Sequence, residues 1–106
     1  MSEQNIITKE LEWKESPLIR FAMWVEYNDK FSDIADHDRC LGYKNTMECG
    51  ARCVKTGKII KLSFIKETDS FKFVFEHGDT QVIISGASFD ETFETFKKIV
   101  EVFCND

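Results

Sequence analysis

The chain has 106 residues, of which 19 are acidic and 14 basic, giving a net charge of −5. Its 42% apolar content, with ten phenylalanines, excludes a disordered chain and fits a single domain over residues 1–106. The acidic excess argues against a phosphate binder, so we expect no nucleic-acid partner. No apolar run is long enough to span a membrane, and residues 1–5 are too polar for a signal peptide, so we expect a cytoplasmic protein with no membrane partner.

The first third of the chain predicts a helix preceded by a short strand. Residues 5–13 alternate only partially between apolar and polar side chains, which suggests the strand. Ser16 followed by Pro17 is typical of an N-cap and the first helical position. Residues 18–35 fit a helix, but they also fit a strand, because Phe21 and its alternate neighbours are apolar or aromatic. The cap and the length of the segment favour the helix.

The middle of the chain predicts a loop and then four strands. Residues 36–45 are polar and contain a glycine, which indicates the loop. The strands are predicted at residues 46–54, 58–66, 71–76 and 81–85, because apolar side chains alternate along them and short polar turns separate them. Such short connections favour an antiparallel meander.

The C-terminal segment predicts an amphipathic helix. Ser88 and Glu91 have the spacing of a capping box, in which each side chain bonds the other residue's amide. Glu94 precedes Lys98 by one turn and is expected to pair with it. One stripe of the helix is apolar: Phe89, Phe93, Phe96, Val100 and Phe103. The predicted fold is therefore α+β, a four-stranded antiparallel meander packed against a C-terminal amphipathic helix, with an N-terminal helix.

Four residues have the chemistry of zinc ligands: His37, Cys40, Cys49 and Cys53. A structural zinc site uses four such ligands, usually as two closely spaced pairs, and neither pair here has the common two-residue spacing. The favoured interpretation is that the cysteines, with Cys104, are reduced thiols, because nothing in the sequence indicates secretion. Zinc remains an alternative, and no other cofactor is indicated.

No catalytic signature is present. Two histidines and four cysteines occur, but no base is placed beside a nucleophile in the sequence, and no glycine-rich loop could cradle a phosphate. We therefore predict a protein that is not an enzyme.

The sheet face opposite the phenylalanines mixes basic and apolar side chains. The slightly favoured interpretation is that the N-terminal segment covers this face with Trp13, Trp24 and Phe31; if the face is open, its composition is typical of a binding surface. We predict a small acidic protein that acts by protein–protein interaction, as an adaptor, inhibitor or chaperone-like factor, and a homodimer is compatible with this. The candidate partner-binding residues are Trp24, Tyr27, Arg52, Lys61 and Lys72. The alternatives are a zinc-stabilised binding module and, less favoured, an RNA-binding sheet.

Overall fold

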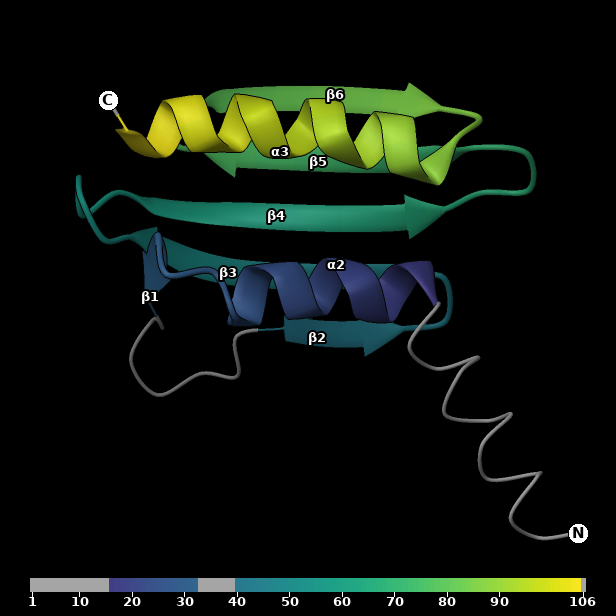
Figure 1. The fold of residues 1–106 in the computed structure, drawn as a ribbon, viewed down its shortest axis with the longest axis horizontal. Helices are drawn as coiled ribbons and strands as arrows, with labels where there is room; N and C mark the ends of the chain where they lie inside the picture. Colours follow the sequence, from purple (N-terminus) through teal and green to yellow (C-terminus); the bar gives the residue numbers. More distant parts are fainter. Residues whose placement is uncertain (1–15, 33–39, 106) are drawn as a thin grey trace, which may run out of the picture.

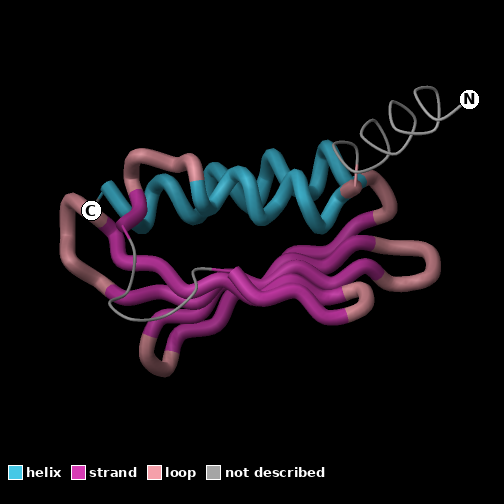
Figure 2. Tube along the Cα trace, turned by 90° about the horizontal axis from the view of Figure 1, so that it is seen from below, coloured by secondary structure: helices cyan, strands magenta, loops and turns pink. Residues whose placement is uncertain are grey.

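The computed structural model describes residues 16–32 and 40–105, and the strand suggested for residues 5–13 lies outside them. Helices α2 (Pro17–Glu26) and α3 (Phe89–Asn105) lie on the same face of one antiparallel sheet (Figure 1; Figure 2). The strands are β1 (Phe31–Ser32), β2 (Cys40–Tyr43), β3 (Thr46–Cys53), β4 (Ile59–Lys66), β5 (Phe71–His77) and β6 (Thr80–Gly86). The α+β class is confirmed, but the prediction of four strands is wrong because β1 and β2 extend the sheet.

The predicted meander forms the main part of this sheet. Strands β3, β4, β5 and β6 follow one another as antiparallel neighbours, while β1 and β2 both pair with β3. The turns after β3 and β5 contain Gly57 and Gly78, both with positive φ angles, a backbone region that glycine enters at little cost. The pairing register places Phe64 beside Phe73 and Leu62 beside Phe75, so one face of the sheet is continuously apolar.

Helix α2 is shorter than the helix expected for residues 18–35. Pro17 occupies the first turn as predicted, although the Ser16 side chain makes no capping hydrogen bond. The helix ends at Glu26 because Asn28 begins a turn: its Oδ1 accepts from the Lys30 amide at 3.0 Å, and its carbonyl accepts from the Phe31 amide. A side chain that bonds the backbone two residues onward competes with helix continuation, and the chain then enters β1.

Strand β2 occupies part of the segment expected to be a loop, residues 36–45. It joins β3 through the two-residue turn Lys44–Asn45, in which Lys44 has a φ of 54°. Hairpin turns of this length need a positive φ, which Gly, Asn and Asp supply more readily than Lys. The sequence therefore carries no strong hairpin signal here, and the strand was missed for that reason.

The core lies between the sheet and both helices, and Phe21 is at its centre. This α2 side chain is fully buried and its ring centroid lies 5.7 Å from Phe64, 5.9 Å from Phe73 and 6.3 Å from Phe96. Phe73 in turn stacks on Phe93 of α3 at 5.4 Å. The predicted apolar stripe of α3 is confirmed, and it packs on the aromatic face of the sheet.

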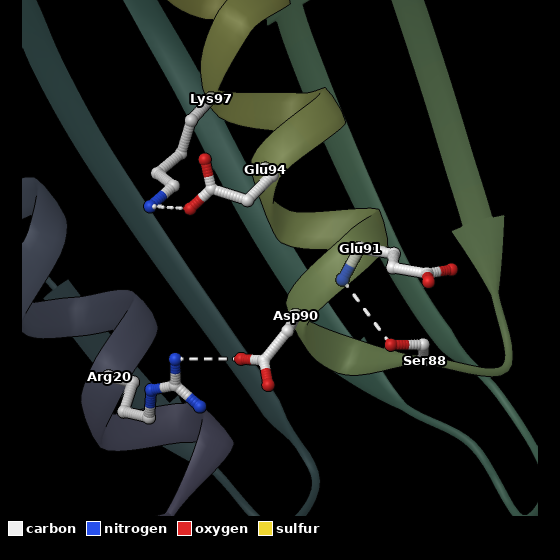
Figure 3. A network of polar contacts seen from close by, with 6 residues as sticks. All are labelled: Arg20, Ser88, Asp90, Glu91, Glu94 and Lys97. Carbon is white, nitrogen blue, oxygen red and sulfur yellow. Dashed lines mark hydrogen bonds and ion pairs between the residues drawn. The ribbon is translucent and has the colours of Figure 1, made fainter.

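Polar contacts fix the start of α3 and its position beside α2 (Figure 3). One of the two hydrogen bonds of the predicted capping box is present: the Glu91 amide donates to Ser88 Oγ at 3.3 Å. Arg20 of α2 forms an ion pair with Asp90 at 2.8 Å, which joins the two helices. Glu94 pairs with Lys97 at 2.6 Å, so the prediction of a pair with Lys98 is wrong.

Candidate functional site

The face of the sheet opposite α2 and α3, called the outer face below, is the strongest candidate site. Among the described residues no helix or strand covers it (Figure 2). The expectation that Trp24 and Phe31 cover it is wrong, because Trp24 packs against both Phe31 and Phe93 on the helical side; Trp13 lies outside the described residues. Alternation along each strand places fifteen side chains there: Leu41, Tyr43, Thr46, Glu48, Arg52, Ile59, Lys61, Ser63, Ile65, Lys72, Val74, Glu76, Gln81, Ile83 and Ser85. Strands with one solvated face normally carry polar side chains on it. Here six of the fifteen are large and apolar or aromatic, which is more than solubility requires.

One row of side chains crosses the outer face from edge to edge. The register aligns Leu41, Glu48, Ser63, Val74 and Ile83 on five neighbouring strands, a span of about 19 Å at the usual strand spacing. Ser63 and Val74 in the middle are only 8% and 7% exposed, whereas Leu41 and Ile83 at the ends are 64% and 51% exposed. The row is therefore closely packed at its centre and presents apolar groups at both ends.

The charged groups of the outer face are partly paired with one another. Lys61 lies 3.6 Å from Glu48, with both side chains about half exposed, and Gln81 donates to Glu76 at 2.8 Å. A pair this exposed contributes little stability, about 0–1 kcal/mol. Among the described residues, Arg52 and Lys72 form no ion pair, and the register places them at opposite ends of the face.

The structure divides the five predicted partner-binding residues into two groups. Arg52, Lys61 and Lys72 all lie on the outer face, as the alternation predicted. Trp24 packs edge-on against Phe31 and Phe93 at 5.6 and 5.5 Å, so it is partly buried beside the core.

Tyr27 is 79% exposed at the end of α2, in the helical layer. It borders a shallow hollow of about 280 Å³ between α2 and β2. Pockets that enclose small molecules usually measure about 300–1,000 Å³, so this hollow is small for that purpose. The predicted interaction residues therefore do not form one surface.

Two contributors to the outer face were missed from the sequence. Leu41 and Tyr43 alternate with Cys40 and Gly42, and both are well exposed on β2. This short alternation was the only signal for them, and the segment was predicted to be a loop. Together they extend the apolar part of the outer face to the edge strand.

The four cysteines form two disulfides, which corrects the prediction of reduced thiols. Cys40 and Cys49 are cross-strand partners with Cα atoms 4.1 Å apart. Cys53 at the end of β3 pairs with Cys104 in the last turn of α3, with Cα atoms 5.5 Å apart, and both are buried. The first bridge therefore holds an edge strand, and the second holds α3 to the sheet.

The predicted zinc ligands are distributed between these two bridges. Cys40 and Cys49 share one disulfide, Cys53 belongs to the other, and His37 lies outside the described residues. A sulfur in a disulfide is not the thiolate that zinc binds. Within residues 16–32 and 40–105, no group of three or more His, Cys, Asp or Glu is placed to hold a metal ion. Zinc binding by the reduced chain stays a prediction.

Comparison with protein-family models, with curated proteins and with solved structures finds no match. In the described part of the chain, neither helix has the length and apolar character needed to cross a bilayer.

Proposed function

We propose that this chain is a non-catalytic protein-binding module that acts through the outer face. The observation that carries the proposal is the exposure of Leu41, Ile59 and Ile83 on a face that no described element covers. Exposed apolar groups on a shared surface, surrounded by polar ones, are typical of protein interaction sites.

The charges of the outer face define the chemistry of the partner. Arg52 and Lys72 have no ion-pair partner among the described residues and stand at opposite ends of the face, while Glu48 is engaged with Lys61. A partner that presents apolar side chains together with carboxylates would contact the exposed Leu41, Ile59 and Ile83 and pair with both cations. Charge complementarity of this kind contributes mainly to specificity and to the rate of association.

Selection from a displayed library of random peptides, with the oxidised protein as bait, tests the proposal. We expect enriched peptides to combine apolar residues with Asp or Glu and to bind the wild-type chain more weakly as salt is raised. Ile59→Lys should abolish binding by placing a charge among apolar contacts, and Lys72→Glu should weaken it by reversing the favourable charge.

Tyr27→Ser provides the matched control, because Tyr27 is more exposed than Ile59 but lies in the helical layer. Selected peptides should bind this variant as they bind the wild type. Peptides that lose affinity for Tyr27→Ser and keep it for Ile59→Lys would place the site on the helices and refute the proposal. Enrichment of basic peptides would refute the assigned charge complementarity.

RNA binding fits the outer face less well. Tyr43 is the one aromatic side chain among the outer-face residues, and Glu48 and Glu76 lie between the basic groups. Recognition of single-stranded RNA relies on several stacking groups in a basic surrounding.

The expected cytoplasmic location also stays a prediction, and two disulfides are more usual in oxidising compartments.

A further inference from the structure

Strand β6 forms one edge of the sheet, and its sequence lacks the features that usually prevent edge pairing. It runs for seven residues as Thr-Gln-Val-Ile-Ile-Ser-Gly, with no charge and no proline, and among the described residues it has β5 as its sole strand neighbour. Natural edge strands are usually short, charged, bulged or covered, because unpaired backbone groups recruit another strand.

The opposite edge of the same sheet differs in this respect. It is built from β1 and β2, which are two and four residues long, and both are attached to β3. Short edge strands offer few unpaired backbone groups. The long uncharged edge at β6 is therefore a property of that strand and not of the whole sheet.

The flank of α3 above this edge is also uncharged. Asp90 contacts Arg20 of α2, which marks the flank that faces the other helix. At 3.6 residues per turn, Thr95, Ile99 and Val102 fall on the opposite flank, which faces the β6 edge. Val102 is 62% exposed, although it is a large apolar side chain on a helix whose solvent side is otherwise polar.

The uncharged flank of α3 and the uncharged strand β6 are centred at the same level along the strand direction. A Cβ on Gly86 would meet the side chain of Thr92, so these two residues lie at the same level. Ile83 precedes Gly86 by about 10 Å of strand, which equals about seven residues of helix. Because α3 runs antiparallel to β6 (Figure 1), Ile99 lies at the level of Ile83.

We propose that two copies of this chain pair antiparallel through β6 about a two-fold axis at Ile83. In that register Ile83 meets Ile83 of the second copy, Gln81 meets Ser85, and Val82 meets Ile84, so no charged pair arises along the strands. Because α3 packs on both β5 and β6 (Figure 1), its axis lies about half a strand spacing inside β6, and strand pairing at about 4.8 Å then brings the two α3 helices about 10 Å apart, a normal packing distance. Thr95 of each helix then lies beside Val102 of the other.

A dimer of this form is small. The strand edge is about 23 Å long and the two layers give the contact a depth of about 20 Å, so the area per copy is below the roughly 800 Å² of a standard interface. We therefore expect reversible association with a micromolar dissociation constant.

Sedimentation velocity of the oxidised full chain from about 1 to about 500 µM, a range that brackets micromolar dissociation, tests the proposal. The wild type should shift from monomer to dimer. Ile83→Lys should raise the dissociation constant at least about tenfold, because like charges meet across the two-fold axis. Mixing Ile83→Lys with Ile83→Glu should restore a mixed dimer, since opposite charges then face each other.

Ile59→Lys is the matched control, because Ile59 has the same 51% exposure as Ile83 but lies on β4, away from the edge. It should leave the dimer unchanged. Val102→Lys provides an independent variant, because Val102 is exposed on α3 and the fold does not depend on its side chain. It should weaken the dimer as Ile83→Lys does. A monomer at every concentration, equal effects of Ile59→Lys and Ile83→Lys, or no recovery in the mixture would overturn the proposal.

Discussion

The bridge between Cys53 and Cys104 should make a measurable contribution to the free energy of unfolding. It joins the end of β3 to the last turn of α3 across a sequence separation of 51 residues, whereas the bridge between Cys40 and Cys49 spans 9. In the chain-entropy account, a disulfide stabilises the fold by restricting the unfolded chain, and the effect grows with the logarithm of the loop length. The two bridges should therefore contribute unequally.

The loop lengths give the expected sizes. Loop-closure entropy assigns about 4.1 kcal/mol to the Cys53–Cys104 bridge and about 2.6 kcal/mol to the Cys40–Cys49 bridge at 25 °C. The double substitution Cys53→Ala/Cys104→Ala should thus cost about 1.5 kcal/mol more than Cys40→Ala/Cys49→Ala. Both sulfurs of the longer bridge are buried, so any cavity left by their removal would increase this difference.

Urea unfolding of the oxidised wild type and both double variants measures the free energies of unfolding. Titration of free thiols in denaturant should find none in the wild type and none in either variant, because each variant keeps one intact bridge. If reductant left the unfolding midpoint of the wild type unchanged, the cysteines would be unpaired, and the sequence-based prediction of reduced thiols would be correct. A larger loss for Cys40→Ala/Cys49→Ala would refute the loop-length argument.

Three further changes test single features of the fold. Phe21→Ala should lower the free energy of unfolding by about 3–5 kcal/mol, measured in urea, because it leaves a cavity where α2, α3 and the sheet meet. The hydrogen bond and charge of Lys97 lower the pKa of Glu94. The pair therefore stabilises the fold above the ordinary carboxyl pKa, and this stabilisation is lost as the pH falls through the lowered pKa. In Lys97→Ala, a carbon-13 NMR titration should show that the pKa of Glu94 is higher than in the wild type. Gly86→Ala should cost about 1–3 kcal/mol, since its Cβ would overlap buried Thr92 Oγ1, and adding Thr92→Ala should recover part of the loss in a double-mutant cycle.

The elements with strong periodicity were predictable from the sequence. Phe89, Phe93 and Phe96 repeat at the helical period behind a Ser88 cap, and Phe71, Phe73 and Phe75 alternate as a strand does. These local patterns also set which side of the sheet faces the core. For that reason the sequence alone predicts the positions of Arg52, Lys61 and Lys72 on the outer face.

The elements that depend on long-range contacts were not predictable in the same way. Strand β2 is held by pairing with β3 and by the bridge from Cys40 to Cys49, and its own four residues contain little strand signal. Trp24 could equally have been an exposed anchor, because its burial depends on Phe93 from the other end of the chain. The partners of the cysteines likewise cannot be read from spacing, since four cysteines allow three pairings.

The two proposals use adjoining surfaces of the sheet, the outer face and the β6 edge, which share Ile83, and they would reinforce each other. Pairing through β6 about an axis perpendicular to the sheet would leave both outer faces exposed on the same side, with the two Ile83 side chains between them. A partner with two binding segments would then gain avidity from the dimer without any new contact. Ile83→Lys should therefore weaken a bivalent peptide far more than a monovalent one, whereas Ile59→Lys should abolish binding of both. If Ile83→Lys weakened the two peptides equally, Ile83 would act only as a contact on the outer face, and the dimer would have no role in binding.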